Sequence, residues 1–218
     1  MQNIVVYGAG GHAKAVIDAI EKAGLYHIAG LLDGFKTAGT FVYGYEILGD
    51  ESWLASNAES ISSGIVAVGD NWSRSRIAAA IISINPAFTF ITAVHPASSI
   101  AKGASIGEGT VVMAGAVINS DTRIGDHCVL YPNTSVDHDC TVGSFVTFAP
   151  KAATGGNVNI GNYSVISLGA NIIHGRTIGE NTVIGAGSTV LSDIGSHAIA
   201  YGTPARFVRK REPGERYL

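Results

Sequence analysis

The chain has 218 residues, of which only 14% are charged, and its formal net charge is −3. This mild acidic balance argues against a nucleic-acid-binding protein, which normally presents a basic face. The N-terminus lacks the regions of a signal peptide, no stretch approaches about 18 uninterrupted apolar residues, and the two cysteines, Cys128 and Cys140, imply no disulfide framework. We therefore expect a cytoplasmic protein without membrane insertion.

The first part of the chain alternates between predicted strands and helices. Short apolar runs predict the strands, and the helical spacing of apolar residues predicts the helices. In chain order, we predict a strand over 3–7, a helix over 12–24, strands over 27–33 and 64–70, a helix over 74–83 and a strand over 88–94. Alternating βαβ units imply a parallel sheet with right-handed crossovers, so residues 1–93 are predicted to form an α/β domain.

From Val94 onward the hydrophobic pattern has a period of six. Every sixth residue up to Val190 is aliphatic or aromatic except Thr154, and the residue four positions later is mostly small or β-branched. This hexapeptide pattern is typical of a parallel β-helix, whose triangular coils stack about 4.8 Å apart. We predict such a helix over 94–195, with both cysteines at interior corners, followed by a C-terminal extension over 196–218.

One histidine of the repeat region, His138, lies between Asp137 and Asp139. Neighbouring carboxylates orient an imidazole and raise its basicity, as a general base requires. Three hexads make a coil of about 18 residues, so His138 should lie beside Gly156, whose bare N–H can stabilise an oxyanion. A solvated surface histidine is the simpler alternative, but the break at Thr154 favours catalysis. The histidines lack the compact spacing of a metal site, and we expect none.

The segment GAGGHA (8–13) lies between a predicted strand and a predicted helix, and Asp33 follows about twenty residues later. This arrangement matches a dinucleotide-binding fingerprint, in which glycines let the backbone approach a phosphate at a helix N-terminus. The same physics serves a nucleotide-linked sugar, and about ninety residues are few for a complete NAD-binding fold. A tight turn without a ligand is the alternative.

Taken together, the motifs resemble one known family. The segments VDHDCTVG (136–143), GGNVNIG (155–161) and YGTPARFVRK (201–210) are similar to the left-handed β-helix acyltransferases. The segments YGAGGHAKAVID (7–18) and VGDN (68–71) resemble the PglD/NeuD-type sugar O/N-acyltransferases. This resemblance covers essentially the whole chain. It implies a Rossmann-like α/β domain followed by a left-handed parallel β-helix, in a homotrimer with active sites between neighbouring β-helices.

The resemblance also implies an activity and a set of site residues. The activity is acetyl transfer from acetyl-CoA to the amine of a nucleotide-linked amino-deoxy sugar, UDP- or GDP-linked, in surface-glycan biosynthesis. His138 matches the family's general base, Asp139 the acid that follows it, and Gly156 the amide that holds the thioester oxygen. The implied acetyl-CoA contacts are Gly156, Leu168, Gly169, Ala186 and Arg206. The implied contacts of the nucleotide sugar are Gly10, Gly11, His12, Asp33 and Asn71.

Two departures and two alternatives accompany this assignment. Thr147 stands where many relatives carry a second histidine, and LYPNTS (130–135) departs from the Asn-Thr-Gly sequence that relatives often have before the motif. One alternative activity is O-acetylation of sialic acid. The other is a non-catalytic scaffold that senses a nucleotide, although a scaffold has no need of the imidazole between two acids.

Overall fold

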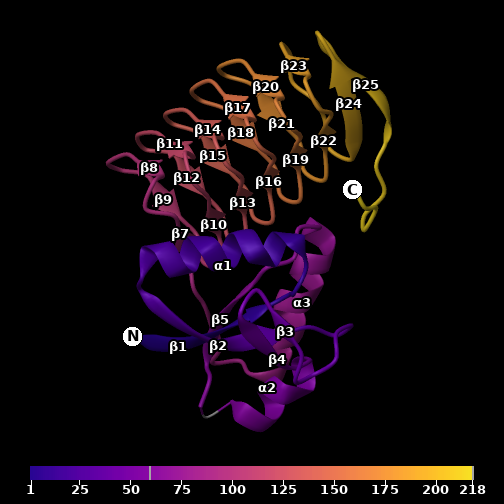
Figure 1. The fold of residues 1–218 in the computed structure, drawn as a ribbon. Helices are drawn as coiled ribbons and strands as arrows, with labels where there is room; N and C mark the ends of the chain where they lie inside the picture. Colours follow the sequence, from indigo (N-terminus) through magenta and orange to yellow (C-terminus); the bar gives the residue numbers. More distant parts are fainter. Residues whose placement is uncertain (59, 218) are drawn as a thin grey trace.

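The computed structural model describes residues 1–58 and 60–217, which form an α/β domain lying beside a long β-helix (Figure 1). The chain passes from the first part to the second only once, and its C-terminal residues then return from the far coils toward the α/β domain. Among the described helices, none combines the length and the apolar character that crossing a bilayer would need.

A six-stranded sheet forms the centre of the α/β domain, in the order β3-β4-β2-β1-β5-β6. All its pairings are parallel except the one between β3 and β4. Its strands are β1 (Gln2–Tyr7), β2 (Tyr26–Leu32), β3 (Phe41–Val42), β4 (Tyr45–Gly49), β5 (Ser63–Val66) and β6 (Thr89–Phe90). The helices are α1 (Gly11–Ala23), α2 (Glu51–Asn57) and α3 (Asn71–Ile84). The predicted parallel sheet is therefore present, and β3, β4 and α2 are additions that periodicity did not indicate.

Helix α1 lies between the sheet and the β-helix and joins their cores (Figure 1). Its side chains Val16 and Ile17 are fully buried, in one apolar cluster with Ile4 of β1 and with Val111 and Val129 of the β-helix. Because burial of each large aliphatic side chain contributes roughly 1.5–3 kcal/mol, this shared cluster fixes how the two parts sit against each other.

The β-helix consists of two-residue parallel strands that form three sheets, one for each face of a triangular prism; the longer β24 and β25 extend the first sheet, and β25 pairs antiparallel with β24. The first sheet contains β7 (Ala93–Val94), β10 (Val111–Val112), β13 (Val129–Leu130), β16 (Thr147–Phe148), β19 (Val165–Ile166) and β22 (Val183–Ile184), followed by β24 (Ala198–Gly202) and β25 (Ala205–Lys210). The second contains β8 (Ser99–Ile100), β11 (Val117–Ile118), β14 (Ser135–Val136), β17 (Ala153–Thr154), β20 (Asn171–Ile172) and β23 (Thr189–Val190). The third contains β9 (Ser105–Ile106), β12 (Arg123–Ile124), β15 (Thr141–Val142), β18 (Asn159–Ile160) and β21 (Thr177–Ile178).

From Val112 to Val190 the period-six residues are buried along the axis of the prism, as the sequence predicts, whereas Ile100 of the first coil is exposed. Leu130, Phe148 and Ile166 pair in register on successive coils and are fully buried. Cys128 and Cys140 are also buried, at the expected interior corners, and both are free thiols. Burial raises the pKa of the Cys128 thiol to about 12, so this group stays protonated and behaves as a small apolar side chain.

A second period of six, which the sequence analysis did not identify, lies in the backbone. One residue of nearly every hexad, three positions after the axial residue, has a positive φ between 50° and 83°. Several of these residues are not glycine, although a left-handed conformation costs other residues roughly 1–2 kcal/mol. His127, Phe145 and Tyr163 occupy this position on consecutive coils, and their rings stack at centroid distances of 4.9 and 5.1 Å. Stacking offsets part of the backbone cost.

The predicted strand over 88–94 is two separate strands. β6 pairs with β5 in the α/β domain, and β7 pairs with β10 in the β-helix, so the chain crosses between the two parts after Phe90. The predicted strand over 64–70 ends at Val66, because the following turn caps α3, where the Asp70 carboxylate accepts the Ser73 N–H. The residues of the predicted C-terminal extension form β24, which pairs with β22, and β25, which pairs with β24.

Candidate active site

His138 lies at the corner that follows β14, where the second sheet of the prism turns into the third. Its Nδ1 atom is 2.7 Å from Oδ2 of Asp139, and about half of the ring is exposed. Asp139 occupies the left-handed corner position, with φ 56°, and this conformation brings its carboxylate beside the preceding side chain. A proton on Nδ1 donates to the carboxylate, so Nε2 is left with a lone pair that can accept a proton.

The electrostatics of this corner favour a charged imidazole. The hydrogen bond with Asp139 is the largest influence and raises the pKa of His138, and the charges of Asp137 and Asp139 act in the same direction. A raised pKa makes the ring a stronger base. The pair therefore has the geometry and the basicity that proton abstraction requires.

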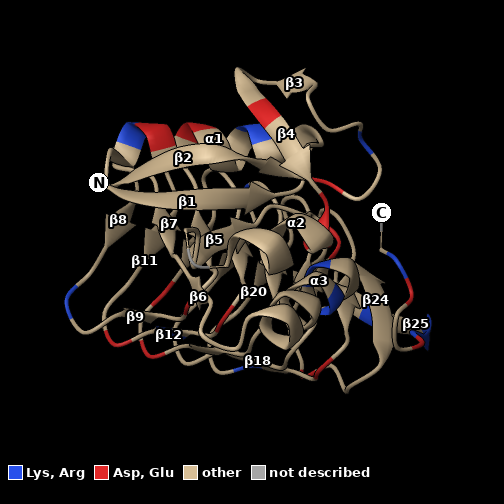
Figure 2. Ribbon diagram, turned by 90° about the horizontal axis from the view of Figure 1, so that it is seen from below, with Lys and Arg blue, Asp and Glu red and all other residues tan. Residues whose placement is uncertain are grey.

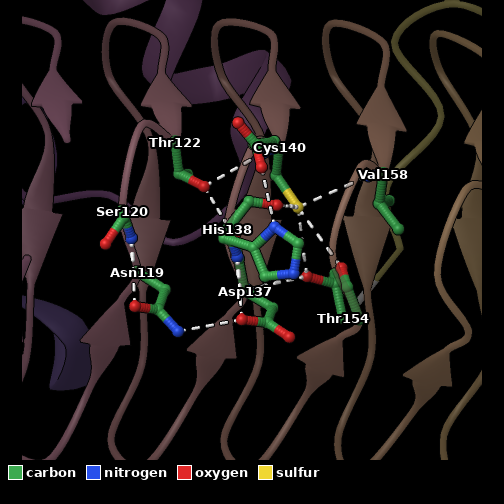
Figure 3. A network of polar contacts seen from close by, with 10 residues as sticks. Asn119, Ser120, Thr122, Asp137, His138, Cys140, Thr154 and Val158 are labelled. Atoms are coloured by element: carbon green, nitrogen blue, oxygen red, sulfur yellow. Dashed lines mark hydrogen bonds and ion pairs between the residues drawn. The ribbon is translucent and has the colours of Figure 1, made fainter. Parts of the chain in front are cut away.

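The Asp137 carboxylate bonds to a backbone N–H and a neighbouring side chain rather than to the imidazole ring (Figure 3). Its Oδ1 accepts the N–H of His138 and the side-chain amide of Asn119, each at 2.8 Å. These two bonds lower the pKa of the Asp137 carboxyl, the bond from the His138 N–H being the larger influence. Of the two acids that flank the imidazole, Asp139 is thus the one that orients the ring.

Threonines on the neighbouring coils hold the same loop. Thr154, the single exception to the aliphatic pattern, accepts the N–H of Asp137 at 3.3 Å. Thr122 donates to the carbonyl of Asp137 at 2.5 Å and accepts the N–H of Cys140 at 3.1 Å. The break in the repeat therefore has a physical role, since an aliphatic residue at position 154 would leave the Asp137 N–H without this acceptor.

Gly156 lies one coil from His138, as the predicted stacking requires, with Val136 and Thr154 paired in register. A Cβ at Gly156 would be 2.5 Å from Cε1 and 2.6 Å from Nε2 of His138, so the ring fills the space of the missing side chain. Across residues 1–58 and 60–217, the Gly156 N–H donates no hydrogen bond, whereas the N–H groups on either side bond to Ile172 and His138 carbonyls. Gly156 is itself buried against the ring, so this unbonded amide lies close to the base.

The residues expected to contact acetyl-CoA lie at other places in the chain. Leu168, Gly169 and Ala186 follow β19 and β22, at the corner between the first and second sheets; Leu168 and Ala186 are exposed and Gly169 is half-buried. His138 is at the opposite edge of the second sheet. Arg206 is exposed on β25 and donates to the carbonyl of Ala205. One chain alone therefore does not bring these residues next to the imidazole.

The α/β domain contains a cavity of about 760 Å³ at the carboxyl ends of β1 and β2 and along one side of α3. Its lining residues are Tyr7, Gly8, Asp33, Gly34, Phe35, Glu51, Val68, Asp70, Ser73, Arg76, Ile77, Ala80 and Arg216. Asp33, predicted from the sequence, lies here, and its carboxylate accepts the N–H groups of Ala9, Phe35 and Lys36. Cavities of this size at the carboxyl ends of parallel strands are common ligand sites.

The other predicted nucleotide contacts divide into two groups. Gly10 and Gly11, at the start of α1, are exposed, and a Cβ at either would meet nothing within 4 Å. His12 and Asn71 instead face the β-helix: His12 Nδ1 is 3.0 Å from the hydroxyl of Tyr131, and Asn71 donates to the carbonyl of Tyr163 at 2.7 Å. Burial, aided by the charge of Arg74, lowers the pKa of His12 to about 3. Both side chains therefore make contacts between the α/β domain and the β-helix.

Comparison with known proteins gives four relevant matches. A family model described as the PglD N-terminal domain matches residues 3–81. The structure superimposes with a TM-score of 0.90 on a variant of perosamine N-acetyltransferase from Caulobacter crescentus in complex with CoA and GDP-perosamine, at 32% identity, covering 96% of this chain and 98% of that one. The chain belongs to the PglD-type family of left-handed β-helix acetyltransferases.

Two further relatives of this PglD-type chain agree in reaction class. The acetyltransferase domain of PglB from Neisseria gonorrhoeae, in complex with acetyl coenzyme A, superimposes with a TM-score of 0.87 at 31% identity, covering 95% of this chain and 99% of that one. A UDP-N-acetylbacillosamine N-acetyltransferase from Bacillus subtilis is 32% identical over 124 residues, 52% of each chain, so this match spans about half of that relative. The predicted fold, the acyltransferase class and acetyl-CoA as cosubstrate are thereby confirmed for the family.

Several cavity residues were not identified from the sequence. Phe35 is fully exposed at the cavity although it is a large apolar side chain. Glu51 accepts the hydroxyl of Tyr7 there, and Arg216 comes from the far end of the chain. One sequence feature could have indicated part of this cavity: Phe35 directly follows the Asp33-Gly34 pair after a predicted strand.

Proposed function

We propose that this PglD-type protein transfers an acetyl group from acetyl-CoA to the amine of a nucleotide-linked amino sugar. The observation that supports this most is the juxtaposition at one corner of the prism. The Nε2 atom of His138, oriented through the Nδ1–Asp139 bond, lies over Gly156, whose N–H has no partner among the described residues. The relatives bound to CoA and GDP-perosamine support the substrate class.

In the proposed reaction, the nitrogen of the amino sugar attacks the acetyl carbonyl carbon while His138 Nε2 takes a proton from that nitrogen. The carbonyl oxygen becomes an oxyanion, which accepts a hydrogen bond from Gly156 N–H. The carbon–sulfur bond then breaks, and the CoA thiolate takes the proton back from the imidazolium. Asp139 holds the ring in the reactive tautomer throughout. Transfer is direct, because this scheme uses no covalent intermediate on the enzyme.

We further propose that the working form is a homotrimer. Within one chain, His138 and the predicted acetyl-CoA residues Leu168, Gly169 and Ala186 lie at opposite edges of the second sheet. Cyclic packing of three prisms brings one edge of each chain against a different edge of its neighbour. The acetyl group would then reach the imidazole from a groove between two chains, and Arg206 would lie near the end of that groove.

The compartment and pathway follow from the same chemistry. We place the reaction in the cytoplasm, where a reducing environment suits the two free thiols, and in the biosynthesis of a surface glycan, which consumes nucleotide-linked sugars.

A thiol-release assay tests the proposed function. The protein would be mixed with acetyl-CoA and with UDP-, GDP- and dTDP-linked 4-amino sugars, with the corresponding hydroxyl sugars as controls. We expect release of free CoA with at least one amino sugar and none with its hydroxyl counterpart. Free sialic acid in the same panel tests O-acetylation. Release with sialic acid alone, or with no acceptor in the panel, would contradict the proposal.

A further inference from the structure

The last residues of the chain form a fixed arch that reaches the α/β domain. After β25, the guanidinium of Arg211 is buried and donates to the carbonyl of Tyr163 at 3.0 Å and to Asn71 at 3.5 Å. At the other end of the arch, the hydroxyl of Tyr217 donates to the carbonyl of Gly69 at 2.8 Å. Both ends of this seven-residue segment (211–217) are thus attached where the α/β domain meets the β-helix.

Bonds within the arch hold its middle. Glu215 pairs with Arg209 at 2.6 Å, and its carboxylate also accepts the N–H of Glu212 at 3.1 Å. The carbonyl of Glu215 accepts a bond from Arg211 at 2.9 Å. Because both neighbours of Arg216, Glu215 and Tyr217, are bonded in this way, the arch fixes where the Arg216 backbone lies, beside the cavity that its side chain lines.

Arg216 lines the cavity of the α/β domain together with Arg76 of α3. Figure 2 shows that the basic segments of α3 and of the C-terminal end lie on the same side of the molecule. Both side chains are exposed, and in the described part of the chain neither forms an ion pair. The Arg76 side chain donates to the hydroxyl of Ser73 at 3.4 Å.

Acidic groups occur in the same cavity, and their bonds distinguish them from the two arginines. Asp33 accepts three backbone N–H groups, Glu51 accepts the Tyr7 hydroxyl, and Asp70 caps α3. Each carboxylate therefore accepts at least one bond from the protein, although Oδ2 of Asp70 is buried without a partner among the described residues, whereas the guanidinium groups offer unused donors. Planar guanidinium groups bind phosphate oxygens in a bidentate way, and this makes arginine the usual residue for a diphosphate.

We propose that Arg216 of the C-terminal arch, with Arg76 of α3, binds the diphosphate of the nucleotide-linked substrate. This inference rests on the proposed function, because that function supplies a ligand with two adjacent phosphates. Tyr217 acts as a positioning residue that keeps Arg216 at the cavity through its bond to Gly69. The C-terminus of the chain thereby completes a substrate site whose other walls lie in the first eighty residues.

Calorimetric titration of the full-length protein tests this assignment. UDP, GDP and dTDP, and then the matching nucleosides, would be titrated into the wild-type protein and into Arg216→Ala, Arg76→Ala and the control Lys102→Ala, which removes an exposed cation of the first coil. We expect each arginine variant to bind the preferred diphosphate about tenfold to a hundredfold more weakly, as loss of a hydrogen bond to a charged group implies. Nucleoside binding and the control should be unchanged, and Arg216→Lys should restore part of the affinity.

The outcomes separate this inference from the proposed function. Unchanged diphosphate affinity in Arg216→Ala, an equal loss for the nucleoside, or no diphosphate binding by the wild-type protein would each overturn the inference. If the wild-type protein transfers acetyl groups and Arg216→Ala keeps the same KM, the function stands and the inference fails. If diphosphate binding depends on both arginines but no amino sugar is acetylated, the inference stands and the proposed activity fails. Tyr217→Phe should weaken diphosphate binding less than Arg216→Ala does.

Discussion

The β-helix and the α/β domain position their proposed functional groups by different rules. In the β-helix, a side chain meets partners 18 residues away, as Asn119 meets Asp137 and Thr110 meets Cys128. In the α/β domain, the walls of one cavity come from residues as distant as Tyr7 and Arg216. A periodic fold therefore makes the neighbours of a residue predictable, and a functional position stands out as a break in the repeat. The cavity instead depends on loops and on the end of the chain, whose positions no sequence repeat predicts.

This contrast implies a separation of roles that mutation can test. If the corner at His138 performs the chemistry and the cavity holds the nucleotide, variants of the corner should change turnover and leave nucleotide affinity alone. Variants of the cavity should do the reverse. A single site that combined both roles would lose both properties together.

The largest effect is expected at His138. Replacing it with alanine removes the general base, so turnover should fall by about 10²–10⁴-fold, while calorimetric binding of the preferred nucleoside diphosphate stays unchanged. The matched control is His174→Ala, since His174 is an exposed histidine at the same corner two coils on. Near-normal turnover in His138→Ala, or an equal loss in His174→Ala, would remove the assignment of His138 as the base.

A smaller but still large effect is expected at Gly156. A methyl group there would lie 2.5 Å from the imidazole, so Gly156→Ala must displace the His138 ring. Because misplacement of a catalytic group by about 1 Å costs about 10²-fold in rate, turnover should fall by roughly that factor. Gly195→Ala is the control, since a Cβ at Gly195 meets nothing within 4 Å. Full activity in Gly156→Ala would show that the ring does not need this close contact.

The comparison also explains how much was predictable from the sequence. The period of six was sufficient to predict the β-helix, the interior cysteines and the neighbours His138 and Gly156, because each follows from counting along a repeat. The left-handed corner position, three residues after the axial one, went unnoticed because its side chains vary widely, from glycine to Phe145 and Tyr163. Only the folded structure shows that these aromatic rings stack on one another.

Contacts between distant segments account for most of what sequence reasoning missed. Arg74 is fully buried, and within residues 1–58 and 60–217 no carboxylate pairs with it. Its guanidinium instead donates to the carbonyls of Val68, Gly69 and His127. Nothing local in the sequence distinguishes such an arginine from an exposed one. The same holds for Asn71, a nucleotide contact implied by the family resemblance, whose side chain bonds across the junction to the β-helix.

The junction between the two parts should limit stability in acid. His127 is buried there, and burial together with the charge of Arg74 lowers its pKa to about 4; the pKa of His12 is lowered to about 3. In the unfolded chain both are near 6.5, so between these values the unfolded state binds more protons. The free energy of unfolding should therefore have its full value above about pH 6.5 and decrease as the pH falls toward 4. For His127 this decrease is at most about 3 kcal/mol.

Urea unfolding between pH 7.5 and 4.5 measures this decrease. His127→Phe should make the curve flatter, because a phenylalanine already occupies the equivalent corner one coil away at Phe145 and stacks there. His27→Gln, at an exposed histidine, should leave the curve as in the wild-type protein. A pH dependence that persists unchanged in His127→Phe would show that this buried histidine does not contribute to it.

A modest effect on rate, and a clear one on pH dependence, is expected at Asp139. The hydrogen bond from the ring raises the pKa of His138 above its usual value, so the wild-type protein should lose activity as the pH falls through that raised pKa. Asp139→Asn keeps a side chain suited to the left-handed corner but removes the charge. The acidic limb of kcat/KM should move to lower pH, with a plateau reduced by about tenfold or less. The same substitution at Asp137, which bonds to the backbone, should move the limb less.

The smallest effect is expected at Cys140, which lies two residues from the base and is the only cysteine near it. Its sulfur is buried and faces the interior, where it contacts the carbonyl of Gly155 at 3.3 Å and accepts the N–H of Val158 at 3.4 Å (Figure 3). A serine hydroxyl can make the same two bonds, so Cys140→Ser should fold normally and keep the wild-type turnover.

Mass spectrometry of the wild-type protein mixed with acetyl-CoA alone should then show no acetylated enzyme. A folded but inactive Cys140→Ser protein, together with an acetyl group trapped on this sulfur, would replace direct transfer with a covalent route and would move the nucleophile from the surface corner to the interior of the prism.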